Sequence, residues 1–171
     1  MGKFKVVLAL AILIALIAPA WAVLGTFAFG FLVAPAALIS AGIYVADGAQ
    51  VKHSPKIALG FVAGNFWAYF VVKALGVFGM GPLQLFLVLV VFVLVAVFLA
   101  MYFDKVFDLS AWLTAWAGTL VVLTLPGMPL SPEQALLQMG VSYVAGVFVV
   151  GLPILYLHGL CVKKLQGGKK P

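Results

Sequence analysis

Asn65 and Ser142 are the uncharged polar side chains placed deepest in the long apolar segments of this 171-residue sequence. An amide or a hydroxyl at mid-segment can form hydrogen bonds with a small polar molecule near the bilayer midplane. The same groups can also have structural roles, because an amide can join two helices and a serine hydroxyl can bond to its own helix backbone. The residue types leave both roles open for Asn65 and favour the structural role for Ser142.

Four further residues complete the candidate pore-lining set. Trp67 lies too close to mid-segment to be an interfacial anchor, so it is a candidate for a constriction. Pro35 is expected inside a helix, where it would free the carbonyl of Phe31 and kink the chain. A packed kink is the alternative. The remaining candidates are Ser40 and Thr119.

The sequence offers few residues for proton-coupled transport or metal binding. The four acidic residues lie in predicted loops or near segment ends, whereas proton-coupled pumps need a buried ionisable relay. His158 and Cys161 supply only two possible ligands, and a structural zinc site needs four. We therefore expect no enzymatic activity, no metal and no cofactor.

The composition excludes a soluble domain. Hydrophobic residues make up 66% of the chain, charged residues make up 8%, and the mean hydropathy is +1.28. Soluble domains are about half apolar and a quarter charged. The sequence therefore predicts an all-α membrane protein with six transmembrane helices. The predicted spans are about 6–24, 27–46, 55–75, 83–103, 107–125 and 132–157.

The charge distribution predicts the topology. The net charge of +6 comes from ten lysines and four acidic residues, without arginine. If both termini are cytoplasmic, nine of the ten lysines lie on that side and only Lys73 lies outside. This placement favours a topology signal over nucleic-acid binding. The first span resembles a cleavable signal peptide but is long enough to be retained, and we expect it to be uncleaved.

An internal similarity predicts two halves. The Ser54-Pro55 pair recurs as Ser131-Pro132, and the offset of 77 residues superposes the first three predicted spans on the last three. Each pair predicts a serine N-cap followed by proline at the first helical position. Three spans are an odd number, so the second half would be inverted in the membrane. Chance similarity between apolar segments is the alternative. The single membrane domain, residues 1–171, would comprise repeat A at about 1–78, repeat B at about 79–158 and a cytoplasmic tail at 159–171.

Several short motifs resemble a known family. They are WAVLG at 21–25 followed by GFL at 30–32, AGIY at 41–44, and AGNFWA at 63–68. Together they resemble the YcdZ-like small inner-membrane proteins, a domain-of-unknown-function family of short six-span chains. The resemblance implies a prokaryotic inner membrane and supplies no catalytic or binding residues.

These observations favour a homo-oligomeric channel or facilitator that passes a small uncharged solute or dissolved gas. The first and fourth spans would face lipid or neighbouring copies, and the other four would surround the path. The alternative is a binding or scaffolding subunit of a larger transport complex, because small six-span chains also resemble the capture subunits of energy-coupling-factor importers. Ala11 and Ala15 on the first span would then suit docking of a partner helix.

Overall fold

The computed structural model describes residues 2–48 and 50–166, and every regular element in these ranges is helical. This confirms the all-α fold class. The elements are α1 (Gly2–Phe27), η1 (Ala34–Ala36), α2 (Ala37–Ala46), η2 (Val51–His53), α3 (Ser54–Phe78), α4 (Pro82–Tyr102), α5 (Leu109–Thr124), α6 (Pro132–Ala145), η3 (Gly146–Gly151) and α7 (Leu152–Gln166).

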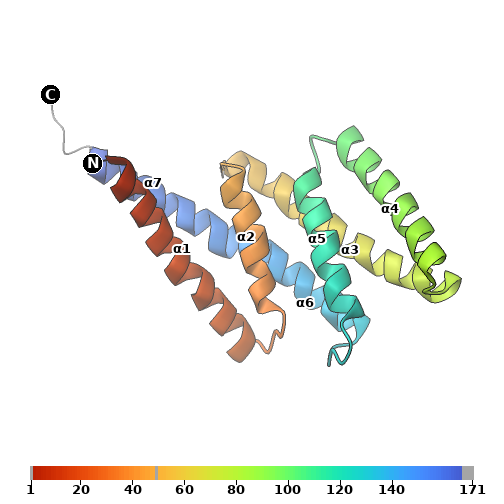
Figure 1. The fold of residues 1–171 in the computed structure, drawn as a ribbon. Coiled ribbons are helices and arrows are strands. Elements are labelled where there is room, and N and C mark those ends of the chain that lie inside the picture. The colour runs from red at the N-terminus through yellow and green to blue at the C-terminus, as the bar shows by residue number, and fades with distance from the viewer. Residues whose placement is uncertain (1, 49, 167–171) are drawn as a thin grey trace.

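Within the described residues, four helical segments are long and apolar enough to cross a membrane. They are α1, the η2–α3 segment, α4, and the continuous helix formed by α6, η3 and α7. The helices at 34–46 and 109–124 are also apolar but shorter. In Figure 1, α1 and α4 lie toward opposite ends of the molecule, α7 runs beside α1, α3 runs beside α4, and α2 and α5 lie between them.

The second predicted span differs from the structure. A helix was expected over 27–46, but α2 is regular only over Ala37–Ala46. Gly30 has a φ of 68°, a left-handed conformation that ends the helical path after α1. Pro35 lies in the short 3₁₀ turn before α2, so it does not kink a helix interior. The Phe31 carbonyl accepts a hydrogen bond from the Ala34 N–H at 3.2 Å.

The two Ser-Pro pairs begin their helices differently. Ser131 caps α6, because its hydroxyl accepts from the Gln134 N–H at 3.2 Å and the Gln134 side chain accepts from the Ser131 N–H at 3.0 Å. Ser54 is instead the first residue of α3, and its hydroxyl donates to the Val51 carbonyl at 2.8 Å. The expected N-cap is therefore correct for Ser131 and wrong for Ser54.

Glycines allow two close helix crossings at the centre. A Cβ atom on Gly60 would lie 2.6 Å from the Asp108 carbonyl oxygen, and one on Gly64 would overlap the Trp112 carbonyl. Gly60 and Gly64 form a GxxxG motif, and such motifs allow two helix backbones to approach closely. Here the motif brings α3 against the backbone of α5. At the second crossing, a Cβ on Gly146 would overlap Ser40 and the Ala37 carbonyl, so η3 meets α2.

The helix connections lie along two edges of the molecule. The N-terminus and the α2–α3 and α4–α5 connections lie along the upper edge in Figure 1, which we call the lysine edge. The α1–α2, α3–α4 and α5–α6 connections lie along the opposite edge. Lys52 and Lys105 belong to connections of the lysine edge, whereas Lys73 is near the opposite end of α3. Lys169 and Lys170 lie outside the described residues.

Candidate functional site

The buried polar side chains come from the four helices expected to form the centre. Among the described residues, α1 and α4 contribute none of them. A hydroxyl or amide is costly to place in an apolar interior unless it finds a hydrogen-bond partner. The partners of these groups therefore decide what the centre can do. The buried polar residues are Ser40 on α2, Ser54 and Asn65 on α3, Thr119 on α5, and Ser142 on α6.

Asn65 joins three helices. Its side-chain oxygen accepts a hydrogen bond from the Thr119 hydroxyl at 2.8 Å, and its Nδ2 donates to the Leu136 carbonyl at 2.9 Å. A carbonyl can only accept, so the Leu136 bond fixes the orientation of the amide. Asn65 and Thr119, two of the predicted pore-lining residues, are thus in direct contact. In this structure they hold α3, α5 and α6 together.

One donor of Asn65 remains available. The amide carries two N–H groups, and only one of them has an acceptor among the described residues. Gly140 packs against this amide, because a Cβ on Gly140 would lie 2.9 Å from Asn65 Nδ2. Asn65 and Gly140 both line a groove between α3 and α6. The amide could therefore donate to a carbonyl or hydroxyl oxygen that enters from the groove.

Ser40 and Ser142 are fully buried but do not join helices. The Ser40 hydroxyl donates to the Ala37 carbonyl of its own helix at 3.2 Å. The Ser142 hydroxyl has no hydrogen-bond partner among the described residues. Ser142 therefore matches neither the cross-helix pattern of Asn65 nor the local bond that the sequence favoured for it.

Two other predicted residues lie away from Asn65 and Thr119. The Trp67 indole N–H donates to the Phe92 carbonyl of α4 at 3.0 Å, and its ring lies edge-on to that of Trp112 at 5.7 Å between centroids. Trp67 thus packs at the outer side of α3 against α4. Pro35 is exposed in the turn before α2. The structure places neither residue in the buried polar centre.

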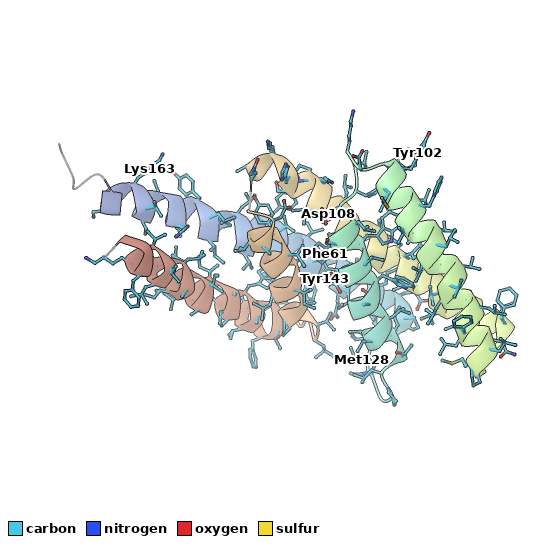
Figure 2. All side chains as sticks on the ribbon, turned by 45° about the horizontal axis from the view of Figure 1, so that its top comes forward. Phe61, Tyr102, Asp108, Met128, Tyr143 and Lys163 are labelled. Carbon is cyan, nitrogen blue, oxygen red and sulfur yellow. The ribbon has the colours of Figure 1, made fainter. Side chains whose placement is uncertain are left out.

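An aromatic pair was missed by the sequence reasoning. Phe61 and Tyr143 are fully buried, with ring centroids 4.9 Å apart, and Figure 2 shows them at the centre of the molecule. The Tyr143 hydroxyl donates to the Ala115 carbonyl at 3.4 Å. Phe61 lies one turn before Asn65 on the same face of α3. Its position in the GxxxG motif, one turn from Asn65, was the available signal.

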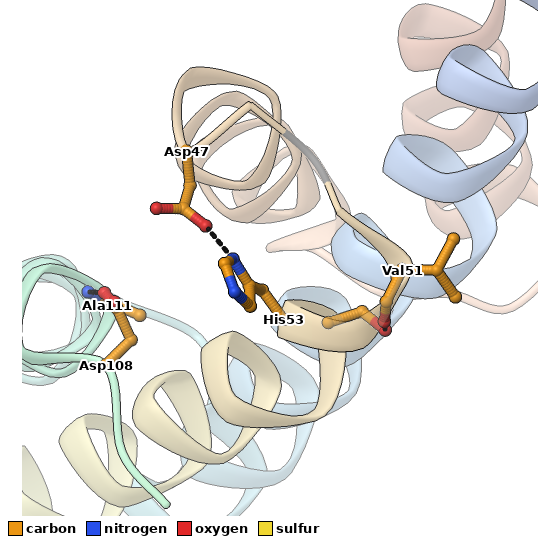
Figure 3. Close-up of polar contacts among 6 residues, drawn as sticks. Asp47, Val51, His53, Asp108 and Ala111 are labelled. Atoms are coloured by element: carbon orange, nitrogen blue, oxygen red, sulfur yellow. Dashed lines mark hydrogen bonds and ion pairs between the residues drawn. The ribbon is translucent and has the colours of Figure 1, made fainter. Parts of the chain in front are cut away.

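Polar side chains at the lysine edge connect and cap the ends of helices. Figure 3 shows the His53 ring facing Asp47, with 3.0 Å between Nδ1 and Oδ2. Asp108 caps α5 by accepting from the Ala111 N–H at 2.9 Å. Both partners of the His53–Asp47 pair are more than one-third exposed, so water screens their interaction. These contacts connect and cap helices.

A second polar group bridges α3 and α6 near the opposite edge. The Tyr69 hydroxyl donates to a Glu133 carboxylate oxygen at 3.0 Å, and Lys73 Nζ lies 3.6 Å from the same oxygen. Lys73 also lies 5.0 Å from the centre of the Tyr69 ring. We call these three residues the α3–α6 clamp. Lys73 and Glu133 are far apart in the chain, so no local sequence pattern indicates their contact.

Comparison with known proteins identifies the family. No curated protein and no solved structure matches the chain. A family model described as "Protein of unknown function (DUF1097)" matches residues 11–156. The match begins within α1 and ends within α7, so it includes both helix crossings and every candidate residue described above. The chain belongs to this uncharacterised domain family.

Proposed function

We propose that this protein is a passive membrane facilitator for a small uncharged solute or dissolved gas. The observation that carries the proposal is the origin of the buried polar side chains. They come only from α2, α3, α5 and α6 among the described residues, and none of them is a carboxylate, an amine or an imidazole. A centre of amide and hydroxyl groups suits selection by hydrogen bonding and width better than ion coupling.

The proposed path passes the Asn65–Thr119 contact and the Phe61–Tyr143 pair. In the described conformation these groups pack against each other and close the path. A solute oxygen could accept a hydrogen bond from the second Asn65 N–H, while a solute N–H or O–H could replace Thr119 as donor to Asn65 Oδ1. If the solute replaces these hydrogen bonds as it passes, the buried Asn65 amide is never left without partners. The cost of burying an unpaired polar group is then avoided.

The proposed topology has six passes with both termini in the cytoplasm of a prokaryotic cell, and the membrane is the inner membrane. The lysine edge carries Lys52 and Lys105 between helices, and the opposite side carries Lys73, in line with the positive-inside bias. The shorter helices, α2 and α5, would cross together with their flanking turns. The short motifs described above also favour the YcdZ-like members of the family.

The proposed architecture is a pair of inverted three-helix repeats. Matching contacts support it, because α4 packs against α3 while α1 packs against α7. Likewise α3 packs on α5, while α6 and η3 pack on α2. Each contact in these pairs joins one half of the chain to the other half. The exposed apolar faces of α1 and α4 are then available to lipid or to further copies in a homo-oligomer.

Solute flux into liposomes tests the facilitator. Purified protein is reconstituted, and stopped-flow light scattering measures entry of urea, ammonia, water and small alcohols. We expect at least one solute to enter faster than into empty vesicles, and Asn65→Leu to change that rate. Fluxes equal to those of empty vesicles for all these solutes would refute the facilitator. An unchanged rate in Asn65→Leu would refute the path past Asn65.

A partner-dependent binding or scaffolding subunit is the second candidate. The observation that favours it is an exposed strip on α1, where Ala11 and Ala15 face outward one turn apart. Energy-coupling-factor capture subunits are the class that it would resemble. Native mass spectrometry from a mild detergent separates the two candidates. A co-purified foreign subunit would favour this role, and a symmetric homo-oligomer would favour the facilitator.

A further inference from the structure

The groove between α3 and α6 is a second feature with binding potential, and it shares Asn65 with the buried centre. It has a volume of about 590 Å³ and is open along one side. Its walls are almost entirely apolar, with Glu133 at one end. The wall residues include Val62, Phe66, Leu137, Val141, Val144 and Phe148.

The length of the groove suits a hydrocarbon chain. Lining residues on α6 and η3 run from Glu133 to Val149, which corresponds to roughly 24 Å along a helix. One leaflet of the hydrocarbon core is about 15 Å thick, half of the whole core. A single acyl chain that enters beside Glu133 therefore fits within the groove. The apolar walls give such a chain contacts comparable to those of a protein interior.

The charged groups at the Glu133 end suggest the head group. The α3–α6 clamp presents one cation and one anion 3.6 Å apart, and both side chains are more than half exposed. A ligand with a single negative charge would approach Lys73 but would be repelled by Glu133. A ligand with both a phosphate and an ammonium group can pair with both side chains at once.

We propose that the groove between α3 and α6 binds one zwitterionic phospholipid whose head group carries a phosphate and a primary ammonium. Its phosphate pairs with Lys73, its ammonium donates hydrogen bonds to Glu133, and one acyl chain lies along the groove. A primary ammonium has three N–H donors, whereas a quaternary ammonium has none and loses the hydrogen bonds to the carboxylate. This site does not depend on whether the protein conducts a solute.

Competition among three lipids tests the head-group preference. Purified protein is mixed with micelles that contain equal amounts of phosphatidylethanolamine, phosphatidylcholine and phosphatidylglycerol, all with dioleoyl chains. Native mass spectrometry then counts the bound molecules of each lipid. We expect phosphatidylethanolamine to be enriched roughly threefold, the scale of one exposed ion pair. Equal retention of the three lipids would overturn the proposal.

Charge variants of the clamp show whether it sets the preference. Glu133→Gln and Lys73→Gln should each reduce the enrichment of phosphatidylethanolamine, until the three lipids are bound in nearly equal amounts. The double exchange K73E/E133K restores one charge of each sign and should recover the enrichment. Because the exchange keeps the pair across the same two helices, its recovery separates head-group recognition from a general effect on folding. An enrichment that survives both single variants would overturn the assignment to the clamp.

A matched pair of tryptophan variants locates the acyl chain. Val141 lines the groove and is 39% exposed, whereas Val90 on α4 lines none of the described pockets and is 44% exposed. We expect Val141→Trp to fill the groove and abolish the enrichment, and Val90→Trp to leave it unchanged. Equal enrichment in the two variants would place the lipid elsewhere and overturn the proposed site.

Discussion

The two close helix crossings of this protein handle buried polar groups in different ways. Where α3 meets α5, hydrogen bonds run between helices, from Thr119 to Asn65 and from Asn65 to the Leu136 carbonyl. Where η3 meets α2, the Ser40 hydroxyl bonds within its own helix and the Ser142 hydroxyl has no partner among the described residues. The first crossing is therefore held by packing and polar contacts, and the second by glycine-mediated packing.

Adding a methyl group at the crossings should have the largest effect. Cβ atoms on Gly64 and Gly146 would overlap backbone atoms of the facing helix, which cannot rotate away. We expect Gly64→Ala and Gly146→Ala each to lower the free energy of unfolding by about 1–3 kcal/mol or more, as overpacking does. Unfolding in mixed micelles measures the change. Gly76→Ala is the control, because none of the described atoms beyond its own stretch of helix lies within 4 Å of the added Cβ. A matching loss in Gly76→Ala would contradict the crossing geometry.

Removing the amide of Asn65 should have the next largest effect. Asn65→Leu leaves the Thr119 hydroxyl and the Leu136 carbonyl without their partner. Interhelical hydrogen bonds in membranes contribute about 1–2 kcal/mol in model peptides, so we expect a loss of that order. The same unfolding assay measures it. An unchanged stability would show that the amide does not hold the α3–α5 crossing.

A double-mutant cycle isolates the Asn65–Thr119 bond. Thr119→Val keeps the shape of the side chain and removes the donor. We expect the sum of the two single losses to exceed the loss in the double variant by about 0.6 kcal/mol, the average coupling measured for such bonds. Strict additivity of Asn65→Leu and Thr119→Val would mean that their 2.8 Å contact contributes no coupling.

The smallest effect is expected at the second crossing. Ser142→Ala removes a buried hydroxyl that has no partner in the described part of the chain, so it removes an unsatisfied group without breaking a hydrogen bond. We expect unchanged or slightly higher stability, measured beside Asn65→Leu in the same micelles. A loss as large as that of Asn65→Leu would show that Ser142 has a partner when the protein is in the membrane. The contrast between the two crossings would then disappear.

The all-helical class and the division into peripheral and central helices could be predicted from the sequence, because both depend on composition. Spans without polar side chains were assigned to the periphery, and α1 and α4 lie at the two ends of the molecule. The polar residues of the other four spans were assigned to the centre, where Asn65 and Thr119 meet. Ser131 was correctly read as a helix cap from its position before Pro132. These features require only local sequence and the cost of burying polar groups.

The details that were missed depend on contacts between distant residues or on apolar loops. In a membrane protein both the inward and the outward helix faces are apolar, so periodicity does not show that Trp67 faces α4. Hydropathy also cannot separate an apolar turn from an apolar helix, so the true start of α2 at Ala37 was not predicted. The Lys73–Glu133 contact joins residues from different halves of the chain, and no local pattern indicates it.

The π-helical turn η3 changes the direction in which the last long helix presents its side chains. In this turn the N–H of Leu152 bonds to the carbonyl of Val147, five residues earlier. One extra residue in a turn rotates everything after it by about 100°, because an α-helix has 3.6 residues per turn. The last helix can therefore bind α3 with one face before η3 and α1 with another face after it. Ile154 and His158 of α7 contact α1 in this structure. Deleting one residue from 146–151 should turn both side chains away from α1, so the single extra residue of η3 sets which face of α7 meets that helix.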